Sequence, residues 1–177
     1  MLSDLESSFD AERRADLVAQ SAELAEAEHA SIEVVDRLRG TVGRPIHLRT
    51  RSGAPVDGVL TRVEPAYVLV DEGEGLQAIV PLAAVTIVAT LAGPAPRDDR
   101  RRPTLGALLR EIARRGVRVR LIAGAGEVMG RLVRVGADHV DIALDSEGRG
   151  CVRRATGAGV VGVVSVMTAA IEVLRSR

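Results

Sequence analysis

The pattern of apolar and polar positions between residues 44 and 88 occurs a second time between residues 117 and 174. Self-similarity at a fixed offset predicts two copies of one structural unit. With an offset of 72 residues, the matched positions include Gly58 with Gly130, Leu60 with Leu132, and Val68 with Val140.

Each copy alternates between apolar and polar residues over short runs, which predicts strands. In the first copy the predicted strands cover residues 46–49, 56–63, 67–70, 77–80 and 85–89. Residues 81–84 form a single turn before the last strand. Gly58 lies inside the second strand, where glycine typically marks a bend. Five short, bent strands predict a small barrel, and the second copy follows the same order.

Three helices are predicted outside the strands. Residues 2–30 contain no Gly or Pro and carry a thin apolar stripe, so this acidic helix is either a coiled-coil arm or a helix lying across a barrel. A short helix over 32–39 is expected to end at Gly40. A third helix over 105–115 is expected to be capped by Thr104 and to end at Gly116.

Residues 92–103 read as an extended linker, with three prolines and six charged residues. The predicted organisation is therefore a helix over 1–31, a first domain over 32–91, the linker, and a second domain over 104–177. The second copy is 14 residues longer than the first, and the extra residues fall around 146–159. We expect functional differences between the copies to lie in that insertion.

A helix ending at Gly, followed by five bent strands with one turn before the last, resembles the Sm-like (LSm) small-barrel family. Gly40 with 46–88 and Gly116 with 117–174 carry the resemblance. It implies a mainly β fold with α, in which an N-terminal helix precedes two tandem five-stranded barrels, each led by a helix. The layout is also similar to actinobacterial proteins with an acidic helical N-terminus and two such segments. The RNA-contacting signatures of Sm proteins are absent from 51–54 and 77–80, so no family site residue is carried over.

The overall composition narrows the possible partners. The 177 residues have a formal net charge of zero, which gives no whole-molecule attraction to nucleic acid or anionic lipid. The single Cys allows no intrachain disulfide, and the N-terminus lacks the pattern of a signal peptide. The longest uncharged run, 155–171, is too short to span a bilayer. We therefore expect a cytoplasmic protein without a membrane partner.

Side chains with catalytic potential are few and scattered. His139 lies beside Asp138 and Asp141, but strand alternation would put only one of these carboxylates on the face of the histidine, which favours an outward polar face over a metal site. Cys151 has no paired base. Residues 157–162 match G-x-G-x-x-G, yet too few residues follow for a dinucleotide-binding unit. The sequence predicts no enzyme, no cofactor, no metal and no small-molecule substrate.

Arginine is the most concentrated polar residue of the second half, whereas the N-terminal helix is acidic. The basic region could hold a phosphate backbone. The acidic helix could equally fold back onto it or bind another copy. The candidate nucleic-acid-binding residues are Arg101, Arg102, Arg114, Arg115, Arg118, Arg120, Arg153 and Arg154. Aromatic residues make up only 1% of the chain, which argues against a stacking platform for single strands.

The pattern as a whole favours a non-catalytic interaction, scaffold or regulatory protein that assembles through barrel edges and its N-terminal helix. Unpaired strands invite pairing, so the fourth and fifth strands of each copy are the expected contact surfaces. The expected partner is protein, either a second copy or another chain. RNA or DNA binding through the arginines is the alternative.

Overall fold

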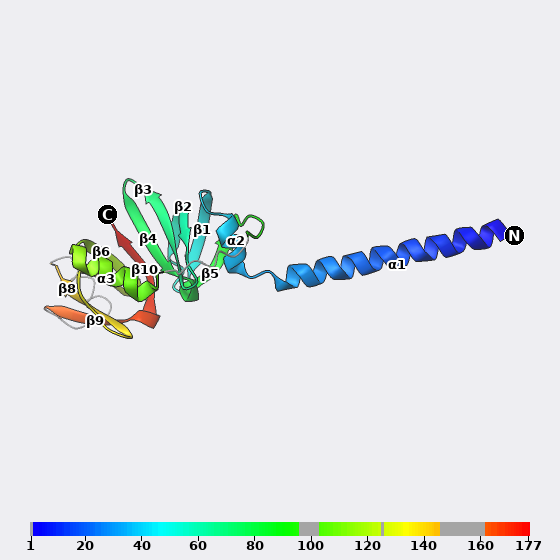
Figure 1. Cartoon of the computed structure of the whole chain (residues 1–177). Helices are drawn as coiled ribbons and strands as arrows, with labels where there is room; N and C mark the ends of the chain where they lie inside the picture. Colours follow the sequence, from blue (N-terminus) through cyan, green and yellow to red (C-terminus); the bar gives the residue numbers. More distant parts are fainter. Residues whose placement is uncertain (1, 96–102, 125, 146–161) are drawn as a thin grey trace.

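The structure is a computed structural model that describes residues 2–95, 103–124, 126–145 and 162–177. It is mainly β, with a ten-stranded antiparallel sheet, two short helices against the sheet, and one long helix at the N-terminus (Figure 1). The linker residues 96–102 and the insertion predicted at 146–159 lie outside the described residues.

The first half of the sheet follows α1 (Leu2–Ser31) and α2 (Val34–Gly40). Its elements are β1 (Pro45–Thr50), β2 (Pro55–Val63), β3 (Tyr67–Gly73), β4 (Leu76–Pro81), the single 3₁₀ turn η1 (Leu82–Ala84) and β5 (Val85–Ala89). The five strands and the turn lie close to where the sequence predicted them.

The second half begins with α3 (Leu105–Arg115). Its other elements are β6 (Arg118–Ala123), β7 (Gly126–Val135), β8 (His139–Leu144), β9 (Val163–Met167), η2 (Thr168–Ala170) and β10 (Ile171–Ser176). Thr104 caps α3 through its hydroxyl, which accepts a hydrogen bond from the Ala107 N–H, and Gly116 ends the helix at φ 64°, as predicted.

The sheet order is β5-β1-β2-β3-β4-β10-β6-β7-β8-β9. The first five strands and the last five therefore have the same internal order, with each half's last strand beside its first and its fourth strand at the far side. The sequence repeat is thus a structural repeat, and the two halves join where β4 pairs with β10.

The two interior glycines hold equivalent places in this repeat. A Cβ on Gly58 would lie 2.2 Å from the Asp71 carbonyl oxygen, and one on Gly130 would lie 2.1 Å from the Ala143 carbonyl oxygen. Asp71 and Ala143 are themselves 72 residues apart. Each half therefore brings the backbones of its second and third strands closer together than any side chain would allow.

Helix α2 ends at Gly40, as predicted, but Gly40 is the last helical residue and does not have the left-handed conformation of a terminating glycine. A Cβ on Gly40 would meet the Gly93 carbonyl oxygen at 2.1 Å. The backbone after α2 instead turns at Gly43, with φ 82°. Gly40 is needed for the close passage of the segment after β5, because the Ala95 N–H donates to the Asp36 carbonyl there.

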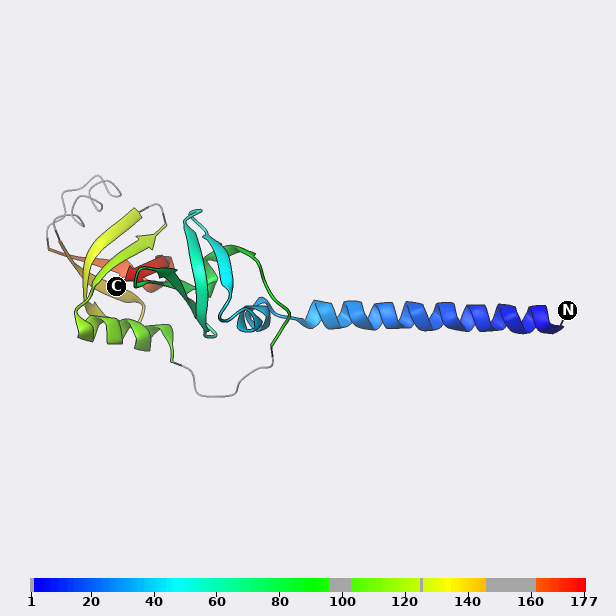
Figure 2. The ribbon, with the colours of Figure 1, turned by 90° about the horizontal axis from the view of Figure 1, so that it is seen from above.

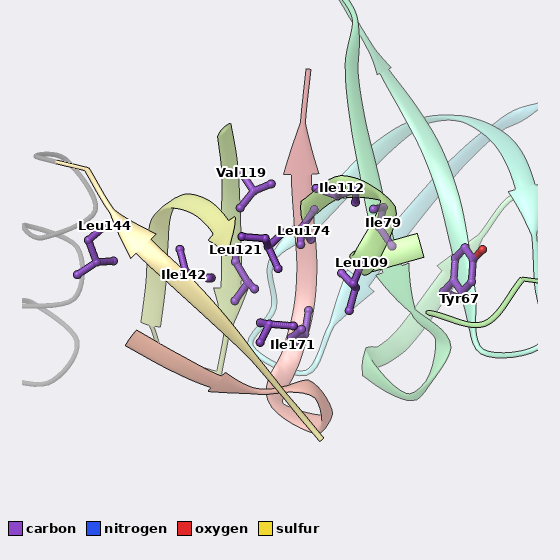
Figure 3. Packing of buried hydrophobic residues seen from close by; sticks show 12 residues of the cluster. Tyr67, Ile79, Leu109, Ile112, Val119, Leu121, Ile142, Leu144, Ile171 and Leu174 are labelled. Carbon is purple, nitrogen blue, oxygen red and sulfur yellow. The ribbon is translucent and has the colours of Figure 1, made fainter. Parts of the chain in front are cut away.

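The apolar cores of the two halves interpenetrate. One cluster contains α3 and the inward residues of β6 to β10, and it also includes Tyr67 and Ile79 from the first half (Figure 3). The other belongs to the first half but includes Val173 of β10, which is fully buried. The side chains at the joint therefore belong to the apolar cores of both halves.

Helix α1 projects away from the sheet along its whole length (Figures 1 and 2). It leaves the molecule at the end that holds α2 and β5, far from the second half. Leu17, Val18 and Leu24 are more than 60% exposed. Of the alternatives for this helix, the structure shows a projecting arm and not a helix folded onto the arginine-rich half.

Candidate assembly surface: the joint and the free strand edges

The joint between the halves is a strand-to-strand contact. In β10, Leu174 stands opposite Ile79 of β4, and Arg175 stands opposite Ala78. On its other edge β10 pairs with β6 of its own half. The chain therefore already contains one example of a fifth strand of one unit docked against the fourth strand of another.

Arg175 forms polar contacts across this joint. Its guanidinium donates from Nε to Oε2 of Glu72 at 2.6 Å and from Nη2 to Oε1 at 2.9 Å. Nη2 also donates to the Pro55 carbonyl at 2.7 Å. The side chains of Arg175 and Glu72 are 14% and 12% exposed. A bidentate pair with so little exposure is a specific contact and not a mobile surface pair.

Glu172 forms the second set of polar contacts between the two halves. It is buried, and its Oε2 accepts from the Ser52 backbone N–H at 3.0 Å and from the Ser52 hydroxyl at 2.5 Å. Burial raises the pKa of this carboxyl, but the hydrogen bonds from Ser52 and Thr50 and the nearby Arg51 outweigh burial and leave the pKa below its usual value. Arg51 in turn donates to the Ala169 carbonyl at 3.0 Å. The β1–β2 turn of the first half is thereby held to the second half.

Two strand edges remain without a neighbour among the described strands: β5 at one end of the sheet and β9 at the other. Both expose large apolar side chains on the face turned away from their own core. Ile87 of β5 is 61% exposed, and Val163 and Met167 of β9 are 54% and 52% exposed. These edges, β5 and β9, are the candidate functional surface.

The sequences of both edge strands lack the usual protection against pairing. β5 reads VTIVA and β9 reads VVSVM, with no charged residue and no proline. Natural sheets commonly place such residues on free edges to prevent association. The absence of charged residues and prolines from β5 and β9 therefore favours strands that pair with a further strand.

The four described candidate arginines are engaged with nearby carboxylates. Arg114 and Arg115 both bind Glu111, and their hydrogen bonds lower the pKa of that carboxyl. The other two pairs are Arg118 with Asp145 and Arg120 with Glu127. Arg101, Arg102, Arg153 and Arg154 lie outside the described residues, as does Cys151.

His139 contacts both neighbouring aspartates, contrary to the expectation from alternation. Asp138 precedes the strand, so its Oδ1 reaches the histidine Nδ1 at 2.9 Å, and this hydrogen bond lowers the pKa of Asp138. Asp141 Oδ1 lies 4.0 Å from Nε2 and accepts from the Ser165 hydroxyl at 2.6 Å. Among the described residues, no group of three or more His, Cys, Asp or Glu side chains could hold a metal ion.

Two hollows lie beside the joint. One, of about 420 Å³, is mainly apolar and is lined by residues that include Pro81, Leu105, Met167 and Ile171. The other, of about 300 Å³, lies where α3 faces β4. Nearby, burial raises the pKa of the Tyr67 hydroxyl, and Glu64 raises it further. The described residues that line the two hollows include no histidine and no cysteine.

The sequence predicted that the fourth and fifth strands contact another protein, and this stays a prediction. Within the chain, β4 pairs with β10. Glu172, Arg175 and Glu72 were missed as joint residues. Glu172 left one signal, because it is a carboxylate between the apolar residues Ile171 and Val173.

No protein-family model matches the chain, and no curated protein matches it. Within the described part of the chain, no helix is long and apolar enough to cross a membrane.

Proposed function

We propose that the protein is a non-catalytic assembly protein that takes up a protein partner along its free strand edges, β5 and β9. The projecting helix α1 serves as an additional contact arm. One observation carries this proposal: the chain joins its own two halves by pairing β4 with β10, and the equivalent edges have no neighbour among the described strands.

Pairing along an edge satisfies backbone donors and acceptors and at the same time covers the exposed apolar side chains of that strand. At the internal joint, β10 shows both effects. Its residues 171–174 are all buried, whereas β5, the equivalent strand, is half-buried or exposed along its length. The free edges are therefore incomplete versions of a contact that the fold already makes.

We also propose that each half is a small barrel of the Sm-like type. The repeated strand order, the leading helix, the interior glycine of the second strand and the 3₁₀ turn before the last strand support this assignment. The assignment concerns the fold alone, because no RNA-contacting signature accompanies it.

The test compares variants that place a charge on an edge with a variant that places the same charge elsewhere. Ile87→Arg alters β5 and Val163→Arg alters β9, whereas Val133→Arg alters an equally exposed residue of the interior strand β7. Sedimentation velocity of the labelled full chain is measured for purified protein and after addition of extract from the producing cells. We expect faster sedimentation in at least one of the two conditions, lost in the edge variants and retained in Val133→Arg.

Sedimentation that is the same for all four proteins in both conditions would refute the proposal. A low-salt titration with labelled RNA and DNA examines the alternative. Nucleic-acid binding that weakens steeply with salt and is retained in the edge variants would favour the alternative, in which the arginines bind RNA or DNA.

A further inference from the structure

The hollow between α3 and the first half of the sheet has a volume of about 300 Å³ and lies beside the joint. Both halves line it. The first half contributes residues of β3, of β4 and of the turn between them, and the second contributes α3, the segment after it and the end of β10. Small-molecule sites have volumes of roughly 300–1,000 Å³, so this hollow is large enough for a small ligand.

One part of the lining is apolar. Leu69 and Ile79 stand opposite each other in β3 and β4, and Leu108 and Ile112 lie one turn apart in α3. Ile79 and Ile112 are buried and belong to one core cluster (Figure 3). Leu69, Leu108 and Val117 are only half-buried. A ligand that removes this remaining apolar surface from water is stabilised by doing so.

The other part of the lining is polar. Gln77 and Ser176 stand opposite each other where β4 pairs with β10, and Arg177 follows at the same end. The side chains of Gln77 and Ser176 form no hydrogen bond to the residues that the structure describes. The Gln77 amide and the Ser176 hydroxyl are therefore donors for a ligand in the hollow.

The polar part has an excess of positive charge beside α3. Oε1 of Glu111 accepts a hydrogen bond from Nε of Arg115 at 2.9 Å, and Oε2 accepts one from Nε of Arg114 at 3.1 Å. One carboxylate thus balances two guanidinium groups and leaves a positive charge over. The Nη atoms of Arg115 form no hydrogen bond with the described residues, so they remain as donors to an acidic group.

These features restrict the ligand to one chemical class. The positive charge at Arg115 favours an acidic head group over a basic one. No aromatic side chain occurs among the described residues that line the hollow, so it has no stacking surface for a nucleobase. The aliphatic side chains of Leu69, Leu108 and Val117 match an aliphatic body.

We propose that the hollow binds a small aliphatic carboxylate, with its hydrocarbon body against Leu69, Leu108 and Val117 and its carboxylate at Arg115 and Gln77. This inference goes beyond the proposed function, because it requires neither free strand edge nor α1. The ligand contacts both halves at once, so it binds the folded chain and not the unfolded one. Binding therefore stabilises the folded protein.

The first experiment measures the affinity of the full chain for butanoate, hexanoate, octanoate and decanoate by isothermal titration calorimetry. The affinity should rise about fourfold for each added methylene until the hollow is filled. Octylammonium, with the opposite charge, should bind at least about tenfold more weakly than octanoate. Affinity that is independent of chain length, or equal affinity for octanoate and octylammonium, would overturn the inference.

The second experiment separates the head-group contact from a general effect on the fold. Arg115→Gln should weaken octanoate binding about three- to fivefold, and Gln77→Glu should weaken it at least as much, since it places a negative charge beside the carboxylate. Both variants should bind octanol as the wild-type chain does. The control is Arg110→Gln, which removes an exposed arginine of α3 outside the lining and should change octanoate affinity less than twofold. Equal weakening of octanoate and octanol would contradict a contact with the carboxylate.

The third experiment locates the bound ligand by nuclear magnetic resonance of the full chain labelled with ¹⁵N. Octanoate should shift the amide signals of Ile79, Leu108 and Val117. Shifts that are instead centred on Ala83 and Ala169 would place the ligand in the other hollow and overturn the assignment.

Discussion

Arg175 in the last strand binds Glu72 in β3 with two hydrogen bonds, and in this way links positions 103 residues apart on opposite sides of the joint. Both side chains are mostly buried. Arg175→Gln would leave the Glu72 carboxylate without its counter-charge. We expect the free energy of unfolding to fall by about 2–3 kcal/mol, measured by urea denaturation.

Arg120→Gln is the matched control for that prediction. Arg120 also forms a two-bond pair with a carboxylate, Glu127, but the arginine side chain is 53% exposed. Its loss should cost less than about 1 kcal/mol. Equal losses in the free energy of unfolding for the two variants would mean that Arg175 stabilises the protein no more than an exposed arginine does.

The interior glycines give a prediction that applies to both halves. Gly58→Ala and Gly130→Ala each force a Cβ against a carbonyl oxygen of the adjacent strand. Each variant should lower the free energy of unfolding by about 3 kcal/mol, and the two losses should be similar because the sites are equivalent. Gly93→Ala, where a Cβ meets nothing within 4 Å, should change it by less than about 0.5 kcal/mol. Tolerance of alanine at Gly58 would contradict the close approach of β2 and β3.

Glu172 makes stability at the joint depend on pH. Its folded pKa is lowered from the usual 4.5, so in the window between the two values the unfolded chain binds more protons. The contribution is therefore present above about pH 4.5 and is lost as pH falls through the folded pKa. Urea titrations from neutral to acidic pH should show a steeper loss for the wild-type chain than for Glu172→Gln. Parallel curves for the two proteins would show that this carboxyl does not contribute.

Removal of residues 1–31 should leave the folded sheet unchanged. Two side-chain hydrogen bonds of α1 stay within the helix, from Ser21 to the Val18 carbonyl and between His29 and the Ala25 carbonyl. We expect the free energy of unfolding to change by less than about 0.5 kcal/mol. A marked loss of stability would mean that α1 packs on the sheet, contrary to its projecting position.

Elements with local signals were predictable from the sequence. β1 shows its position through alternation of apolar and polar residues, and α3 shows its bounds through the Thr104 cap and Gly116. The role of Gly40 was not predictable in this way, because a glycine after a helix reads as a terminator and its packing partner, Gly93, lies far along the chain.

The sequence predicts that strand edges form contacts, but it does not predict which strands pair or which side chains take part. The expectation that fourth and fifth strands make contacts came from the nature of unpaired strands. Long-range geometry determines which two strands pair within the chain. It also determines the hydrogen bonds of Glu172 and Arg175 across the joint. The pairing of Arg118 with Asp145 is likewise invisible to composition, which records only that arginines are abundant.

The exchange of core residues between the halves has a consequence for dividing the chain. Tyr67 and Ile79 complete the core of the second half, and Val173 completes that of the first. A polypeptide ending before the linker would expose the first two side chains, and one starting after it would expose the third. Produced together, the two fragments should find each other without a peptide bond between them, so this protein is a candidate for fragment complementation.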